Sequence, residues 1–272
     1  MSIVPFDNDY LFNKWGLNTI LMTNFMTYKF DSVLSSDLST KTILLIGRGN
    51  AKKKRFYIGV EALEYIVKEI PNCELNIISK FSGIEKLQKL VNNLNLENSI
   101  KFNGYSSSPD IYFRNASLNI IPSISEAFPM VLSETKIYGI PNIVLGLDYV
   151  FNAKGGTIII YDDLPESLAA EAIKIIMEKE YKKKLGKEAR ISMKKFSNDL
   201  LLNDWTELIL SIYKGQNYYN KLREEKKKIS QNVGINILNN QIKLLKIRYE
   251  VFQNITKNEF ENYTFLKNIQ LY

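Results

Sequence analysis

The sequence predicts an α/β protein built on a doubly wound parallel sheet, and three observations support this fold class. Short apolar runs typical of buried strands recur along the chain, segments with apolar residues at helical spacing separate them, and Gly or Pro stands where elements should end. Strands that alternate with helices of about ten or more residues form βαβ units, as in a Rossmann-like sheet. With 272 residues, of which 45% are hydrophobic, the chain has enough apolar side chains for a substantial core.

The first half of the predicted sheet begins with the β-type run Thr42–Ile46, which we assign to a strand. An apolar-periodic helix follows over residues 57–70, and Glu74–Ile78 is the next strand. Apolar residues at three- and four-residue spacing predict a second helix over residues 84–94. Residues 100–102 then form a third strand, so strands and helices alternate along this part of the chain.

The second half of the predicted sheet contains a strand, a loop, a helix and a further strand. Leu118–Ile121 is an apolar run that fits a buried strand. Pro129 suits the first turn of a helix, because the N–H that it lacks has no helical partner there. We expect this helix to run to about Tyr138, to end in a left-handed cap at Gly139 and to lead into a strand over residues 140–145.

Chemically useful groups gather at the start of this helix. The N–H groups near Phe128, Met130 and Val131 point out of the carboxyl edge of the sheet, where the helix dipole favours an anion such as a diphosphate. Glu126 precedes the helix and Glu134 lies on it, and carboxylates accept hydrogen bonds from sugar hydroxyls but repel phosphate. Taken singly, each glutamate is more simply a solvated surface acid. Together with the helix start, they indicate a nucleotide-sugar pocket.

The stretch from Ser125 to Glu134, followed by Tyr138-Gly-Ile-Pro141, resembles the paired-glutamate signature of glycosyltransferase family 4. Members of that family have the two-domain GT-B fold, bind the sugar donor in the C-terminal domain and retain the anomeric configuration. The resemblance implies that Glu126 lies by the donor sugar and that Glu134 binds the nucleotide ribose. It also implies that the backbone after Glu126 meets the diphosphate and sugar of the donor, at Ala127, Phe128, Pro129, Met130 and Val131. Ala127 departs from the family pattern, in which a glycine is usual.

A second motif lies in a distant part of the chain, where Arg48 follows the first predicted strand and Lys54 comes six residues later. In the family that this chain resembles, an arginine and a lysine at this spacing clamp the donor phosphates, which implies the same role here. Both cations suit a diphosphate, since each charge-assisted hydrogen bond contributes about 1.5–3 kcal/mol. Lys53 is an alternative to Lys54, and Arg55 stands where the family has a glycine. Without the glutamate pair, this basic run would indicate only a solvated loop.

The nucleotide base has one candidate contact in the sequence. Tyr105 follows the third predicted strand and fits either the wall of a base site or a partly buried aromatic position. The loop 79–83 is not glycine-rich, as it often is in the family, so its contacts to the base stay open. The chain has no histidine. We expect a nucleoside diphosphate sugar as donor substrate, and no metal or other cofactor.

The resemblance also divides the chain. Residues 41–215 are similar to a whole donor-binding domain, and residues 1–40 only to the end of an acceptor-binding domain and its linker. We therefore expect donor binding but slow turnover by this chain alone, because orienting two substrates supplies about 7–11 kcal/mol of a barrier. The predicted function is hexosyl transfer from a nucleoside diphosphate sugar to a glycan or lipid-linked acceptor, in polysaccharide or lipopolysaccharide biosynthesis. The alternative is a non-catalytic nucleotide-sugar-binding module, or one subunit of a split transferase with a separate acceptor-domain subunit.

Residues 216–272 differ in composition from the rest and form a predicted helical extension. They hold ten Lys and Arg against five Asp and Glu, and apolar residues from Ile235 to Phe252 recur at helical spacing. Three interpretations remain open: a helix docked on its own domain, a coiled coil or contact with an acceptor domain, and peripheral attachment to an anionic membrane surface.

Simple features exclude other classes of protein. No apolar stretch approaches the ~20 residues of a membrane-spanning helix, and the first residues lack the basic start of a signal peptide. The single cysteine, Cys73, rules out an internal disulfide and suits a small buried position in a reducing cytoplasm. We expect a cytoplasmic protein, with peripheral contact at the inner face of the membrane left open. The net charge of +7 comes with no nucleic-acid-binding motif, so no nucleic acid partner is expected.

Overall fold

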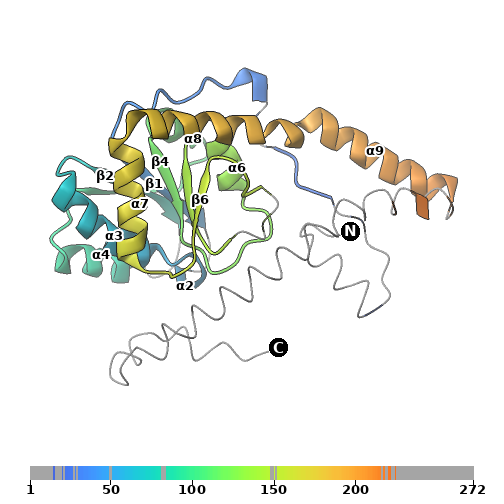
Figure 1. The fold of residues 1–272 in the computed structure, drawn as a ribbon. Coiled ribbons are helices and arrows are strands. Elements are labelled where there is room, and N and C mark those ends of the chain that lie inside the picture. The colour runs from blue at the N-terminus through green and yellow to red at the C-terminus, as the bar shows by residue number, and fades with distance from the viewer. Residues whose placement is uncertain are drawn as a thin grey trace.

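The structure is a computed structural model that describes residues 15, 20, 22–26, 28, 30–48, 51–80, 84–147, 150, 152–215, 217, 220, 221 and 224, with Arg48, Ala51 and Lys52 described by their backbone alone. Within this part of the chain, six strands form one sheet in the order β3-β2-β1-β4-β5-β6, and all neighbouring pairs are parallel (Figure 1). The strands are β1 Thr42–Arg48, β2 Glu74–Lys80, β3 Ile100–Gly104, β4 Leu118–Ile121, β5 Asn142–Leu145 and β6 Thr157–Ile160. This is the strand order of a doubly wound, Rossmann-like sheet.

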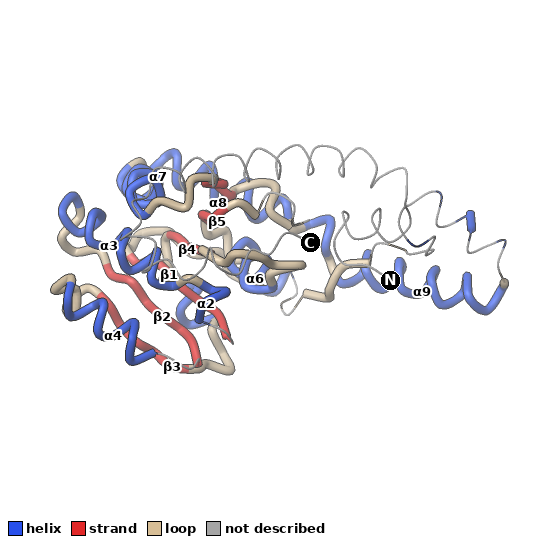
Figure 2. Tube along the Cα trace, turned by 90° about the horizontal axis from the view of Figure 1, so that it is seen from below, coloured by secondary structure: helices blue, strands red, loops and turns tan. Residues whose placement is uncertain are grey.

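Helices pack on both faces of the sheet. Apolar residues of α3, α4 and α7 pack against one face, and residues of α5, α6 and η2 pack against the other. Figure 2 shows α3, α4 and α7 together along one side of the strands. The helices are η1 Phe30–Ser32, α2 Ala51–Lys54, α3 Phe56–Glu69, α4 Ile84–Asn93, α5 Asp110–Arg114, α6 Met130–Ile137, α7 Pro165–Met177, α8 Lys179–Ser192, η2 Lys194–Phe196 and α9 Asn198–Lys214.

The strands and helices predicted from the sequence are present, with small differences at their ends. β5 begins at Asn142, two residues after the predicted start. The helix α6 begins at Met130, because Pro129 has a ψ of 108° and therefore the extended backbone of a residue that precedes a helix. The segment 157–192, which the sequence analysis placed only within the donor domain, folds into β6, α7 and α8.

The central strands are buried on both faces, which explains why their sequences are continuous apolar runs rather than alternating ones. Leu45 packs in the core beneath α3 and α7, whereas its neighbour Leu44 packs in the core beneath α5 and α6. Cys73 is buried and unpaired with another cysteine, in line with the predicted role of a small apolar side chain. The faces of the sheet are thus filled by apolar packing, and the polar groups of interest lie at its carboxyl edge.

The helix α6 ends in a Schellman motif at Gly139, which confirms the predicted cap. Gly139 has a φ of +71°, its N–H donates to Lys136 O at 2.9 Å, and Ile140 N–H donates to Thr135 O at 3.1 Å. A close approach to α8 also depends on glycine, because a Cβ on Gly186 would lie 2.4 Å from Gly139 O. These contacts hold α6 against α8 and so help to set the direction in which α6 points.

The described residues just before β1 pack on the same face of the sheet as α6. Ser36 donates its N–H to Tyr138 O and its hydroxyl to Ala116 O, each at 2.8 Å. Arg190 of α8 donates to Val33 O at 2.8 Å. This segment therefore belongs to the same folded unit as the sheet, while its origin at the end of an acceptor domain stays a prediction.

The helix α9 extends away from the sheet (Figure 1). The predicted apolar stripe from Ile235 to Phe252, with most of the extension 216–272, lies outside the described residues. Among the helices that the structure describes, none is both long enough and apolar enough to cross a membrane.

One lysine is fully buried at the back of α6. Lys136 is 0% exposed, and its Nζ donates to Asn152 O at 2.6 Å and to Lys154 O at 2.7 Å. Burial, with a smaller contribution from the nearby Lys195, lowers the pKa of Lys136 from 10.5 to about 7. The two carbonyls explain why an amine is kept here, since it can donate to both in either protonation state.

We predict that Lys136 makes the stability of the protein rise with pH. Below pH 7 the lysine is protonated in both the folded and the unfolded state, so the cost of the buried charge is fully present. From about pH 7 to 10.5 the unfolded chain holds this proton and the folded chain does not, so the free energy of unfolding should rise by up to about 1.4 kcal/mol per pH unit.

Urea unfolding at about pH 6, 7.5 and 9 measures this rise. The slope should be smaller in Lys136→Met, whereas the exposed Lys187 offers a matched control whose replacement by Met should keep the wild-type slope. Parallel slopes in all three proteins would contradict the assignment.

Candidate functional site

A pocket of about 640 Å³ opens at the carboxyl edge of the sheet. It lies where the strand order reverses, next to the ends of the adjacent strands β1 and β4, which is the usual ligand position in a doubly wound sheet. Its walls come from the ends of β1, β2 and β4, the loop after β3 and the start of α6. The lining residues are Ile46, Gly47, Lys54, Ile78, Ser79, Tyr105, Ser106, Pro109, Ile121, Glu126, Phe128, Pro129, Met130, Val131 and Glu134.

The pocket brings together the two motifs that the sequence analysis singled out. Glu126 and Glu134 come from the paired-glutamate motif, and Lys54 comes from the basic motif after β1. The strand β1 ends at Arg48, directly after the pocket residue Gly47, but the arginine side chain lies outside the described residues. The placement agrees with the predicted site, while the role of each residue stays a prediction.

Lys54 and Glu126 form an ion pair inside the pocket. The Nζ atom of Lys54 lies 2.6 Å from Oε1 of Glu126, and the two side chains are only 26% and 15% exposed. The pair connects the end of α2 with the loop before α6, 72 residues further along the sequence. The cation expected at the phosphates and the carboxylate expected at the sugar are therefore direct neighbours.

Two of the predicted site residues are absent from the pocket walls. The side chains of Lys53 and Ala127 are exposed, and neither lines the pocket. Lys53 instead contributes its backbone, since Ile124 N–H donates to Lys53 O at 2.9 Å. The structure thus favours Lys54 over Lys53 as the lysine that reaches a ligand.

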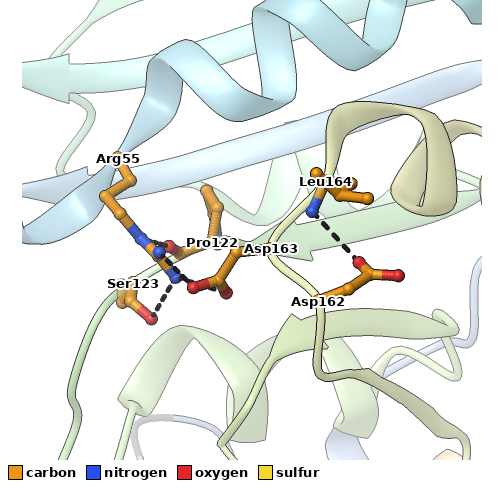
Figure 3. A network of polar contacts seen from close by, with 6 residues as sticks. All are labelled: Arg55, Pro122, Ser123, Asp162, Asp163 and Leu164. Atoms are coloured by element: carbon orange, nitrogen blue, oxygen red, sulfur yellow. Dashed lines mark hydrogen bonds and ion pairs between the residues drawn. The ribbon is translucent and has the colours of Figure 1, made fainter. Parts of the chain in front are cut away.

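Arg55, noted in the sequence only as a departure from glycine, lies behind the pocket wall. Its backbone is left-handed, with φ of 46° and ψ of 39°, a conformation that the glycine expected from the resemblance would adopt without strain. For a residue with a Cβ this conformation costs about 1–2 kcal/mol. The side chain is 2% exposed and offsets that cost with hydrogen bonds to Pro122 O at 2.7 Å and to both carboxylate oxygens of Asp163 at 2.9 and 3.1 Å (Figure 3).

The start of α6 is held from the other side by Asn152. Its Nδ2 donates to Pro129 O at 3.0 Å and to Ser133 Oγ at 2.6 Å, and the side chain is buried. The backbone of Phe128 to Val131 lines the pocket, and the first N–H groups of a helix have no acceptor within the helix. This end of α6 therefore faces the pocket with the positive pole of its dipole.

Two further residues line the part of the pocket nearest β2 and β3. Tyr105 is 66% exposed, so it is a wall residue rather than the partly buried aromatic that was the alternative. Ser79 is only 4% exposed, and its Oγ has no hydrogen-bond partner among the described residues. A buried hydroxyl without a partner is uncommon, and this one belongs to a residue of the pocket wall.

The sequence gave no reason to single out Asp163, Asn152 or Ser79. Asn152 binds a backbone carbonyl of the pocket loop, and Asp163 binds the distant side chain of Arg55. Such contacts leave no spacing pattern in a sequence. Arg55 did carry a signal, because a bulky residue at a glycine position needs a compensating contact. Within the described residues, no cluster of three or more His, Cys, Asp or Glu side chains could hold a metal ion.

Comparisons with known proteins agree with this geometry. The family model for glycosyl transferases group 1 matches residues 29–192. The chain is 26% identical over 189 residues to the poly(glycerol-phosphate) alpha-glucosyltransferase of Bacillus subtilis (strain 168), which covers 68% of this chain and 27% of that protein. It is 20% identical over 176 residues to an uncharacterized glycosyltransferase of Haemophilus influenzae, which covers 63% of this chain and 50% of that protein.

Solved structures show the same fold. A mutant of S. aureus TarM, in complex with fondaparinux, alpha-GlcNAc-glycerol and UDP, superposes with a TM-score of 0.64 at 21% identity, over 75% of this chain and 42% of that one. Anabaena HepE, in complex with UDP and glucose, gives a TM-score of 0.62 at 15% identity, over 70% of this chain and 56% of that one. At these identities the likeness shows the fold alone, that of a GT-B glycosyltransferase domain.

The chain spans 27% and 50% of the lengths of the two curated relatives named above. The family match, by contrast, covers more than half of this chain and includes the whole pocket. The chain belongs to the glycosyl transferases group 1.

Proposed function

We propose that this chain binds a nucleoside diphosphate sugar in the pocket and forms the donor-binding part of a retaining hexosyltransferase of family 4. The acceptor is a glycan or a lipid-linked glycan. The observation that carries this proposal is the convergence of Lys54, the start of α6 and two carboxylates in one pocket at the switch point of the sheet. Each group suits a different part of such a donor.

The positive end of the pocket suits the diphosphate. Lys54 can approach it as a mobile point charge, and the N–H groups at the start of α6 can donate to its oxygens. Glu134, about one turn further along α6, suits the ribose hydroxyls. Glu126 suits the hydroxyls of the sugar. Ser79 and Tyr105, beside β2 and β3, are left for the base.

The same arrangement suits the transfer step. The bond between the anomeric carbon and a diphosphate oxygen breaks, and negative charge develops on the leaving diphosphate. Lys54 and the start of α6 are placed to stabilise that charge. The acceptor oxygen forms the new bond to the anomeric carbon, and its proton passes to the leaving phosphate oxygen.

We assign the acceptor to a site outside the pocket described above. A separate subunit that supplies it is one form of this proposal. Two of the similar structures contain UDP, so UDP is the first probe, with GDP and ADP beside it in a thermal-shift screen. A site ligand at 100 times its dissociation constant stabilises by about 2.7 kcal/mol, which such a screen detects. No stabilisation by any of the three would contradict the proposal.

Lys54→Met should lower the affinity for the nucleoside diphosphate by about ten-fold or more, because a charge-assisted hydrogen bond worth about 1.5–3 kcal/mol is lost. Lys53→Met is the matched control: the same change one residue earlier, at an exposed side chain outside the pocket, should alter the affinity less than about two-fold. Titration calorimetry measures both. Equal losses in the two variants would remove Lys54 from the phosphate site.

Glu134→Ala should lower the affinity for UDP by about ten-fold, because hydrogen bonds from the ribose hydroxyls to a carboxylate are lost. The loss should be much smaller for 2′,3′-dideoxy-UDP, which lacks those hydroxyls. Glu85→Ala, at an exposed position of α4, is the control and should change neither affinity. If Glu134→Ala weakens both nucleotides equally, the carboxylate does not read the ribose.

Ser79→Ala should change stability and binding in opposite directions. Without ligand, the variant loses a buried hydroxyl that has no partner, so the free energy of unfolding should rise by about 1 kcal/mol. The affinity for UDP should fall by about three- to ten-fold if the hydroxyl meets the nucleotide. Ser117, buried but bonded to Thr40 O, is the control: Ser117→Ala should lose stability and keep its affinity.

A further inference from the structure

Arg55 holds together three segments that are far apart in the sequence. The side chain starts from the turn between α2 and α3, and its Nε donates to Pro122 O at 2.7 Å. Its Nη2 lies 3.4 Å from Ser123 O, and the guanidinium pairs with both carboxylate oxygens of Asp163, in the loop after β6. Figure 3 shows the guanidinium between these groups. A fork of this kind fixes orientation as well as distance, which a lysine could not do.

The groups that Arg55 holds lie next to the candidate donor-binding side chains. Pro122 and Ser123 begin the loop that carries Glu126, and the residue before Arg55 is Lys54. Between them, Ile124 N–H donates to Lys53 O at 2.9 Å, and Lys54 pairs with Glu126 at 2.6 Å. The contacts of Arg55 therefore set the distance between the two loops from which the pocket cation and carboxylate project.

Arg55 itself does not reach the pocket. Its side chain is 2% exposed, and it is absent from the pocket walls, which include Lys54 on one side of it and Glu126 across from it. Its bonds to Pro122, Ser123 and Asp163 engage all three guanidinium nitrogens. A direct contact with a ligand would require these bonds to break.

Asp163 does not cap the start of α7, because the adjacent Asp162 accepts the hydrogen bonds there. Asp162 takes the role of holding the start of α7, since it accepts from Leu164 N at 3.0 Å and from Ser167 Oγ at 2.6 Å. Asp163 adopts a left-handed backbone with a φ of 58°, and its carboxylate pairs with Arg55. The two adjacent aspartates thus connect the pocket loop, through Arg55, to the end of β6 and the start of α7 (Figure 3).

We propose that Arg55, oriented by Asp163, is a positioning residue of the donor site: it holds Lys54 and Glu126 at the separation that the diphosphate and sugar require. The inference rests on the proposed function of the pocket. It adds a residue that acts through others and that is itself oriented by an ion pair with a residue 108 positions further along the chain.

The first test needs no ligand. Arg55→Gly keeps the left-handed backbone without strain and removes the guanidinium, so the chain can still fold. By amide hydrogen exchange on the full chain, Ile124 should exchange at least about ten-fold faster than in wild type, beyond any change at Ile77 in β2. Equal acceleration at both amides would mean a general loss of stability and would overturn the positioning role.

The second test compares UDP with UMP, which lacks the second phosphate. In Arg55→Gly the affinity for UDP should fall about ten-fold or more, and the affinity for UMP less than about two-fold. Asp163→Asn should show the same pattern with a smaller loss of UDP affinity, because the hydrogen bonds from Arg55 to Pro122 O and Ser123 O remain. Lys68→Met, which removes an exposed ion pair with Glu64, is the control and should bind both nucleotides like wild type.

The outcomes separate the two proposals. If wild type binds UDP and Arg55→Gly binds it equally well, Arg55 is not a positioning residue and the donor site stands. If wild type binds neither UDP, GDP nor ADP, the donor site is wrong, and with it the purpose assigned to Arg55. In that case faster exchange at Ile124 alone would still show that Arg55 holds the two loops.

Discussion

The loop from Pro122 to Pro129 is held at both ends through its own carbonyl groups, and the geometry of the pocket depends on this. Arg55 takes the carbonyl of Pro122 at the first end, and Asn152 takes that of Pro129 at the second. Both side chains are buried, where a carbonyl without a donor would be costly. Because the anchors bind the backbone, the side chains within the loop are free to face the pocket. The backbone of the loop that carries Glu126 is thus positioned independently of the ion pair that its carboxylate makes with Lys54.

This loop can serve a ligand because of where the sheet places it. β1 and β4 are adjacent and parallel although they are far apart in the sequence, and the chain leaves them toward opposite sides of the sheet. The turn after β1 carries Lys54 and Arg55, and the turn after β4 carries Glu126. The topology brings the two turns together, and the ion pair between Lys54 and Glu126 and the hydrogen bond from Arg55 to Pro122 O join them.

The sequence was sufficient to predict the sheet and most of the residues of the candidate site, because both depend on short, local sequence patterns. Apolar runs located β1 to β5, and the glycine at position 139 located the end of α6. Glu126, Glu134 and Lys54 were found from motif spacing and do line one pocket. The anchors were not found, since Arg55 and Asn152 bind backbone carbonyls distant in the sequence and Asp163 binds the side chain of Arg55. No periodicity or spacing records such contacts. The only hint of these contacts in the sequence was Arg55, which stands where the resemblance leads us to expect a glycine.

The pairing of Lys54 with Glu126 has a consequence for how the pocket treats charge. Two unit charges about 4 Å apart interact by about 4 kcal/mol at an effective dielectric constant of about 20, so a bare carboxylate here would strongly oppose a diphosphate. In the donor complex that we propose, Lys54 offsets that repulsion and at the same time attracts the phosphates, since a lysine ammonium has three donors and can serve both groups. A carboxylate can therefore stand beside the sugar without excluding the diphosphate, provided that the lysine stays between them. The position of Lys54, and hence the contacts of Arg55 that follow it in the chain, decides whether an acid and an anion can share this pocket.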